Sequence, residues 1–124
     1  MSRIIKFRGK SVLNDEWIYG DLVHRIDSPK TISPVQIKGI GVKEETVSQF
    51  TGLLDKDGKE IYEGDILLMG EDEGVRIYNK VGVKDGCFGY IGEYSGELFP
   101  FCNYNVMEEI VGNIYYNPDL IKEE

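Results

Sequence analysis

Apolar and polar residues alternate with a period of two along most of this chain, and this feature constrains the fold more than any other. Such a period is typical of β-strands, because successive side chains point to opposite faces. It is clearest over residues 75–84, and Asp85-Gly86 follows as a pair suited to a tight hairpin, since both residues tolerate a positive φ. We therefore predict that residues 75–84 and 87–91 form a hairpin. One side of its first strand holds Val75, Ile77, Val81 and Val83, with Asn79 as a polar exception, and the other holds Arg76, Tyr78, Lys80 and Lys84.

Short strands of this kind are expected along the whole chain, and no long amphipathic helix is expected. Pro100 lacks an amide donor, so residues 98–101 are predicted to be an edge strand or an extended loop. Residues 44–50 fit either a helical turn or a strand. Asn117 and Pro118 resemble a helix cap and first helical residue, which predicts one or two turns there. The fold class is mainly β, a small barrel or sandwich. Further strands are expected at residues 4–8, 17–26, 35–42 and 109–115.

The length of 124 residues suits one compact domain, or one with an added subdomain. A β-rich first part gives way to a turn-rich connection near Gln49. We predict an N-terminal β-rich part with a hairpin over residues 1–48, and a second part over residues 49–124.

Charge and apolar runs exclude several classes of protein. Fourteen Lys and Arg against 22 Asp and Glu give a net charge of −8, which argues against extensive binding of phosphate backbones. No run approaches the roughly 20 apolar residues of a membrane span, and Lys6 and Arg8 come too early for a signal peptide. Cys87 and Cys102 can form a disulfide between strands, but two reduced thiols are the expected state. A cytoplasmic protein without a membrane partner is expected.

Three blocks of sequence carry a family resemblance. Residues 51–66 read TGLLDKDGKEIYEGDI, residues 5–10 read IKFRGK with WIYG at 17–20, and residues 111–118 read VGNIYYNP. These blocks and their order along the chain resemble the YopX-like family of phage and prophage proteins. The resemblance implies a cytoplasmic phage-derived protein whose second part is an SH3-like, partly open barrel with the N-terminal part packed on it. It also implies self-association, but no established activity and no site residues.

Acidic residues within residues 51–66 suggest a metal site as one interpretation. Glu60, Glu63 and Asp65 have the oxygen ligands that Mg²⁺ and Ca²⁺ prefer, and Asp55 with Glu63 and Asp65 would suit a metal-dependent hydrolase. The expected interpretation is structural: Gly64 relaxes the backbone, Asp65 accepts a hydrogen bond from a nearby backbone amide, and the following apolar residues enter the core. Asp55, Asp57 and Glu60 lack the spacing of a calcium loop, so they are predicted to form a solvated hairpin tip.

His24 is the single histidine of the chain. Catalysis would need a partner serine, cysteine or carboxylate close to it. Because His24 alternates with Ile18, Leu22 and Ile26, we expect a partly buried histidine with a local hydrogen bond. With no CxxC pair, a structural zinc site is not expected either. We expect no enzyme activity and no cofactor.

An interaction surface is the remaining candidate site. Basic residues gather on the N-terminal strand and aromatic residues on the strand that follows. Such a combination can stack and neutralise single-stranded nucleic acid, although most aromatics are expected in the core and in subunit contacts. The candidate surface consists of Arg3, Lys6, Arg8, Lys10, Trp17 and Tyr19.

The expected function is that of a phage accessory protein acting through protein contacts. It would be a homo-oligomer, since exposed strand edges are normally paired or covered, and its partner would be a host or phage protein. Two alternatives remain open: nucleic-acid binding by the basic patch, and mimicry of DNA by the acidic surface, for which Glu71-Asp72-Glu73 is a predicted acidic loop.

Overall fold

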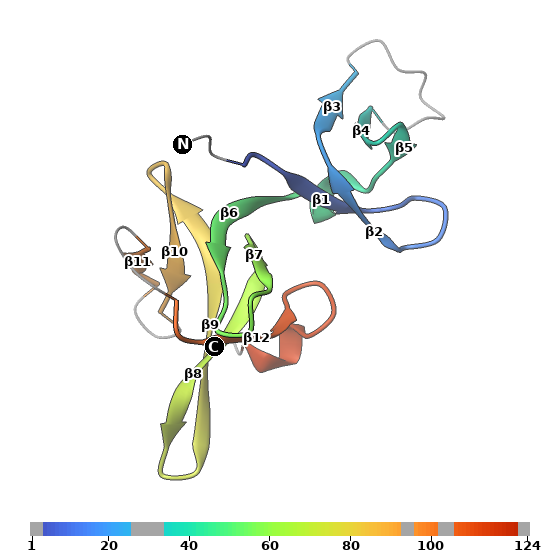
Figure 1. The fold of residues 1–124 in the computed structure, drawn as a ribbon. Helices are drawn as coiled ribbons and strands as arrows, with labels where there is room; N and C mark the ends of the chain where they lie inside the picture. The colour runs from blue at the N-terminus through green and yellow to red at the C-terminus, as the bar shows by residue number, and fades with distance from the viewer. Residues whose placement is uncertain (1–3, 26–33, 93–95, 102–105, 122–124) are drawn as a thin grey trace. The chain divides into compact units, whose positions relative to one another are not determined.

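The computed structural model describes residues 4–25, 34–92, 96–101 and 106–121 (Figure 1). Contacts within the chain divide it into an N-terminal unit, Met1–Phe50, and a C-terminal unit, Thr51–Glu124. Each unit is described by itself below. Residues 51–66, together with the hairpins that follow them, belong to the C-terminal unit.

Short antiparallel strands build the N-terminal unit. β1 (Phe7–Lys10) pairs with β2 (Trp17–Gly20) on one side and with the first residues of β6 (Ser48–Leu54) on the other. β3 (Leu22–His24), β4 (Val35–Ile37) and β5 (Ile40–Gly41) form a second small sheet, and the 3-10 turn η1 (Glu44–Thr46) leads into β6. A compact core results, made of Val35, Ile37 and Val42 with Phe7, Ile18, Leu22 and Val47 packed against them.

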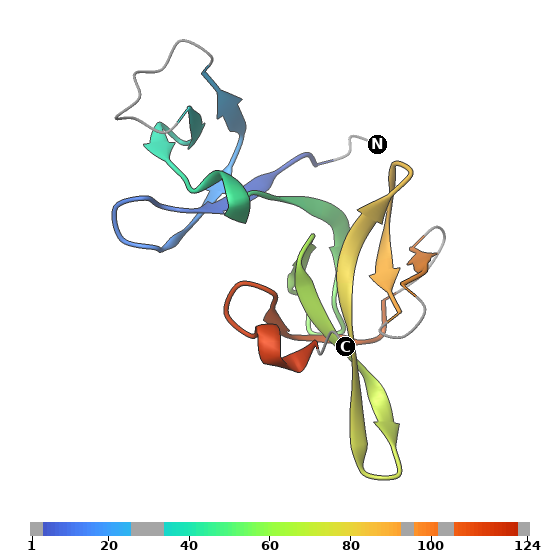
Figure 2. The same cartoon turned by 180° about the vertical axis from the view of Figure 1, so that it is seen from behind.

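A five-stranded antiparallel sheet dominates the C-terminal unit (Figures 1 and 2). β7 (Glu60–Tyr62) lies beside the end of β6 and precedes this sheet, whose order is β11-β10-β9-β8-β12. Its strands are β8 (Asp65–Asp72), β9 (Val75–Lys84), β10 (Cys87–Ile91), β11 (Leu98–Pro100) and β12 (Glu109–Asn113), and the 3-10 turn η2 (Pro118–Leu120) follows. The buried core is formed by Ile61, Leu67, Val81, Phe101 and Val106.

The prediction of a mainly β fold is confirmed. The strands form several antiparallel sheets, and the helical content within the described ranges is two single 3-10 turns. No barrel closes among the residues that the structure describes. The SH3-like character of the second part stays a prediction.

Tight hairpins follow the chemistry of their central residues. Asp85 and Gly86 have φ values of 52° and 79°, so both occupy the left-handed region, and Lys84 pairs with Cys87 as predicted. Lys38-Gly39 and Glu73-Gly74 have the same pair of positive φ values. Two predictions were therefore wrong. Residues 35–42 were expected to be a short strand interrupted by Gly39 and Gly41, but the chain reverses at Lys38-Gly39 to form the β4–β5 hairpin. Glu71 and Asp72 lie in β8 rather than in an acidic loop.

The apolar side of β9 is only partly buried. Val81 is buried as expected, but Val75, Ile77 and Val83 are exposed, and Asn79 is buried among the apolar positions. For Val75 and Ile77 the reason is that β8 and β9 continue as a two-stranded ribbon beyond the neighbouring strands (Figures 1 and 2). Val83 lies at the other end of β9, where it is paired with Phe88 of β10. The period of two correctly predicted which residues share a face, but the outer part of that face has no described layer over it within its own unit.

The C-terminal turn forms, but Asn117 does not cap it. η2 begins at Pro118 as predicted, while the Asn117 side chain makes no capping bond. Its Oδ1 instead accepts a hydrogen bond from the Asn113 amide at 3.2 Å. Asn113 Oδ1 in turn accepts from the amides of Tyr115 and Tyr116. These two asparagines close the loop after β12, which gives both Asn residues of residues 111–118 a structural role.

Asp55 is buried and links distant segments of the C-terminal unit. Its Oδ1 accepts hydrogen bonds from the amides of Asp57 and Lys59, both at 2.9 Å, and its Oδ2 accepts from the Ile110 amide at 3.0 Å. The predicted solvated tip is therefore wrong at this residue. Burial acts to raise the pKa of Asp55, but the three amides outweigh it and hold the pKa below its ordinary value of 3.8.

We predict that Asp55→Ala destabilises the protein, whereas Asp57→Ala, which removes an exposed carboxylate of the same loop, does not. Removing the acceptor leaves three amides without their partner, for an expected loss of about 3 kcal/mol in the free energy of unfolding. Urea denaturation at pH 7 measures the difference. Equal effects of the two substitutions would contradict a structural role for Asp55.

The same carboxylate predicts a dependence of stability on pH. Because the pKa of Asp55 is lowered by folding, its contribution is fully present above the unfolded pKa near 3.8 and is lost as pH falls through the folded value. The stability difference between the wild type and Asp55→Ala should therefore shrink below about pH 4. Denaturation curves between pH 7 and pH 2 test this, and a constant difference would contradict it.

Candidate interaction face

The predicted surface residues come together on one face of the β1–β2 hairpin. Arg8 lies opposite Tyr19 and Lys10 opposite Trp17, and directly opposed residues of antiparallel strands share a face. Lys6 precedes β1 by one residue and falls on the same alternation as Arg8 and Lys10. We call this group the β1–β2 face: Lys6, Arg8, Lys10, Trp17 and Tyr19. Arg3, the sixth predicted member, lies outside the described residues.

Two cations of this face stack on aromatic rings. The guanidinium carbon of Arg8 lies 4.5 Å from the centroid of the Trp17 ring, and the ammonium nitrogen of Lys6 lies 5.4 Å from that of Phe50. Arg8 is buried, with 5% of its surface exposed. A cation held over a ring and shielded from water gains more than one at an exposed site. The contact between Arg8 and Trp17 therefore stabilises the hairpin.

Backbone contacts fix the position of Lys10. Its amide donates to Thr46 Oγ1 at 2.9 Å, and its carbonyl accepts from the Lys43 amide at 2.8 Å. The Lys43 ammonium is bonded to Asp15, so this neighbouring cation is neutralised locally. Tyr19 is 41% exposed and presents the accessible aromatic ring of the face. The β1–β2 face therefore presents the exposed Tyr19 ring on the same side of the hairpin as Lys6 and Lys10.

Phe50 is the member of this arrangement that sequence reasoning did not identify. It lies at the end of residues 44–50, a segment that fitted either a helical turn or a strand. The structure contains both, η1 followed by β6. Since β6 pairs with β1 through Phe7 and Arg8, Phe50 is brought beneath Lys6 by the strand register. Local sequence does not determine such a register, because it depends on a partner about 40 residues away.

We predict that Arg8→Ala lowers the free energy of unfolding by about 2 kcal/mol, because it removes a shielded cation–π pair and the packing of the arginine stem. Tyr19→Ala on the opposite strand, which is exposed, should cost less than about 1 kcal/mol. Trp17 is the single tryptophan, so its fluorescence follows both unfolding and the loss of the Arg8 contact. If both substitutions cost the same, the stacking carries no special stability.

Two carboxylates of residues 51–66 make hydrogen bonds within the fold. Asp65 Oδ2 accepts from the Tyr62 amide at 2.8 Å, as predicted, and Glu60 accepts from the Tyr62 hydroxyl at 3.1 Å. Ile66 and Leu67 are fully buried. Over the described ranges, no group of three or more His, Cys, Asp or Glu side chains is placed to hold a metal ion. These hydrogen bonds give the acidic residues of this segment a structural role.

His24 and Cys87 are exposed. His24 is the last residue of β3, and the prediction of a partly buried histidine was wrong. Alternation places His24 on the same side of the strand as Leu22, but of the two only Leu22 packs against the core of the N-terminal unit. Cys87 is a free thiol on β10. Cys102, like Ile26, lies outside the described residues, so its relation to Cys87 stays a prediction.

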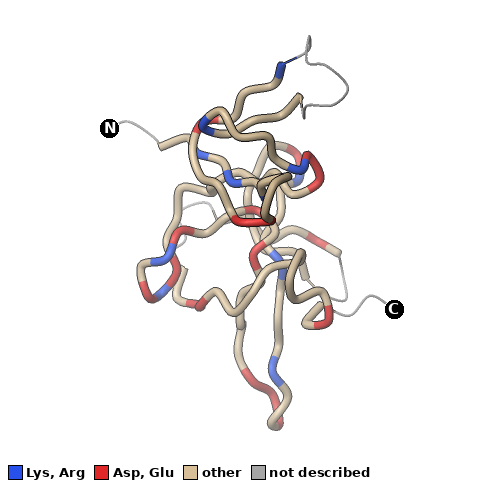
Figure 3. The backbone as a smooth tube through the Cα atoms, turned by 90° about the vertical axis from the view of Figure 1, so that its right-hand side faces the viewer, with Lys and Arg blue, Asp and Glu red and all other residues tan. Residues whose placement is uncertain are grey.

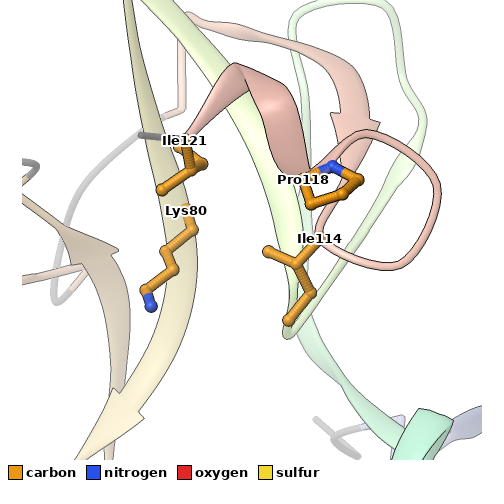
Figure 4. Close-up of a pocket in the computed structure, with 4 residues that line it drawn as sticks. All are labelled: Lys80, Ile114, Pro118 and Ile121. Carbon is orange, nitrogen blue, oxygen red and sulfur yellow. The ribbon is translucent and has the colours of Figure 1, made fainter. Parts of the chain in front are cut away.

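Two shallow pockets lie in the C-terminal unit. One, of about 330 Å³, is lined by Lys80, Ile114, Pro118 and Ile121, with the lysine along one wall (Figure 4). Its described lining offers one ammonium among apolar groups, which is not the paired acid and base of a hydrolytic site. The other, of about 340 Å³, is lined by Lys84, Asp85, Cys87, Glu97, Leu98 and Pro100.

The model of the YopX protein family matches residues 6–122. This chain belongs to the YopX family. Of solved structures, the crystal structure of protein EF1440 from Enterococcus faecalis is similar: it is 26% identical, the match covers 98% of this chain and 100% of that one, and the TM-score is 0.62. No protein with a curated description matches. Within the described part of this YopX-family chain, no helix is long and apolar enough to cross a membrane.

Proposed function

We propose that this YopX-family chain is a phage- or prophage-derived accessory protein that works in the cytoplasm through protein contacts, as a homo-oligomer and without catalysis. The observation that carries the proposal is the β1–β2 face, where an exposed Tyr19 lies on the same face as Lys6 and Lys10. Exposed aromatic side chains are enriched at protein interfaces. The family resemblance to phage proteins supports the origin.

The distribution of charge supports contact between copies. By sequence, the N-terminal unit has eight Lys and Arg against six Asp and Glu, whereas the C-terminal unit has six against sixteen. Figure 3 shows the charged residues of the described ranges along the backbone. A chain of net charge −8 repels its own copies on average. A basic surface of one copy that meets an acidic surface of another reverses the sign of this interaction locally. Oppositely charged surfaces also increase the rate of association.

Light scattering over a range of protein concentrations tests self-association. We expect an assembly larger than a monomer at micromolar concentration. Lys10→Glu and Tyr19→Ala should each reduce the assembled fraction, because one reverses a charge of the β1–β2 face and the other removes its exposed ring. Lys59→Glu is the matched control, since it reverses an exposed charge on the β6–β7 connection. A wild-type protein that stays monomeric would overturn the proposal.

Nucleic-acid binding is the second candidate, favoured by the same combination of cations and aromatics. The stacking of Arg8 over Trp17 weighs against it, because a ring that already carries a guanidinium offers less surface to a base. Labelled single- and double-stranded oligonucleotides at low salt decide between the two. Binding that falls steeply as salt rises, and that Lys10→Glu weakens, would support this candidate.

A further inference from the structure

The β8–β9 hairpin extends away from the rest of the C-terminal unit as an arm (Figures 1 and 2). We define the arm as residues 70–77. Its strands pair through Gly70–Ile77, Glu71–Arg76 and Asp72–Val75, and Glu73-Gly74 forms the turn at its tip. All eight residues are exposed. The arm therefore has water on both of its faces within its own unit.

Apolar β-branched residues lie on this arm. Val75 is 64% exposed and Ile77 is 39% exposed, and the alternation of β9 places both on one face. A two-stranded ribbon is marginally stable in water unless something packs on it. Threonine at these positions would keep a β-branched residue in the strand while exposing less hydrocarbon. The arm thus combines a strand geometry that needs support with side chains suited to a contact.

The tip of the arm is acidic. The arm holds three acidic residues, Glu71, Asp72 and Glu73, and one basic residue, Arg76. The Nε atom of Arg76 lies 3.5 Å from a Glu71 carboxylate oxygen. That pair leaves Asp72 and Glu73 as the negative charges at the end of the ribbon. The described surface with the opposite character is the β1–β2 face, which holds Lys6 and Lys10 beside the exposed ring of Tyr19. Both surfaces pair an apolar group with charge, and their charges are opposite.

We propose that the arm of one copy docks on the β1–β2 face of a second copy. Val75 and Ile77 pack against Tyr19, while Asp72 and Glu73 approach Lys6 and Lys10. The inference rests on the self-association in the proposed function and identifies the surfaces that make it. The occupant is a second copy because this chain carries both halves of a charge-complementary contact.

Substitution of Val75 and Ile77 tests the apolar part of the proposed contact. Val75→Thr with Ile77→Thr keeps β-branched residues in the strand while it removes apolar surface. We expect the dissociation constant of self-association, measured by analytical ultracentrifugation, to rise about tenfold. Val83→Thr is the matched control: it makes the same change on β9 at a residue that is 42% exposed and lies outside the arm. It should change the constant less than about twofold.

A charge exchange tests the pairing of the two surfaces. Asp72→Lys and Lys10→Glu should each weaken association, because each brings like charges together. Both changes in one chain should restore it to within about threefold of the wild type, since the ion pairs re-form with reversed sign. Restoration supports the proposal, because two unrelated surfaces would give additive losses.

The outcomes separate this inference from the proposed function. A wild-type assembly that none of the arm variants weakens overturns the arm proposal and leaves the homo-oligomer standing. A wild type of monomer mass at every concentration overturns both. An arm that binds the face of its own chain would also give monomer mass, and the threonine variants would then change Trp17 fluorescence in the monomer.

Discussion

Hairpin register is the constraint on which the rest of this structure depends. In a β-ribbon a shift of one residue moves every side chain to the opposite face. In β1–β2 the observed pairing places Arg8 and Lys10 with Trp17 and Tyr19. In β8–β9 the pairing shifts between Leu68 and Gly70, so the outer ribbon has its own register. The β1–β2 face and the arm both exist because these registers are held.

Tight turns hold the outer register. Glu73 and Gly74, with φ values of 50° and 81°, close the arm with two residues. Such a turn twists in the sense of the strands that it joins, which makes the pairing of Asp72 with Val75 favourable. The shift near Gly70 separates the buried part of β8 from the arm. The ribbon can therefore leave the sheet without disturbing the core around Leu67 and Val81.

Sequence reasoning predicted these turns unevenly, for a physical reason. Asp85-Gly86 was identified because apolar alternation continues on both sides of it. Glu73-Gly74 was not, since the acidic residues before it resemble a solvated loop. Asn117 is a residue type that commonly caps helices, but its side chain makes no capping bond and instead accepts a hydrogen bond from the Asn113 amide. The type of a residue determines which hydrogen bonds its side chain can make. The path of the chain determines which of these hydrogen bonds form.

Burial was the property least accessible from the pattern. Asp55 looked like part of a solvated tip, yet it is buried, because the Ile110 amide from β12 lies against it. Val75 looked like a core residue but is exposed, because the sheet ends before it. In each case alternation or turn chemistry gave the local conformation correctly. Burial was determined by the neighbouring segment. For Asp55 this segment is 55 residues away in the sequence, and for Val75 none covers it in the described part of its unit.

The separation of charge between the units gives these exposed residues a physical context. An acidic chain stays soluble through repulsion between copies, which would also oppose any assembly. Ten more acidic than basic residues in the C-terminal unit, against a small basic excess in the N-terminal unit, make the repulsion depend on orientation. Contacts between like units are disfavoured, and contacts between unlike units are favoured. An arm with acid at its tip and hydrocarbon along one face uses this difference: charge selects the orientation, and burial of Val75 and Ile77 supplies the stability of the contact.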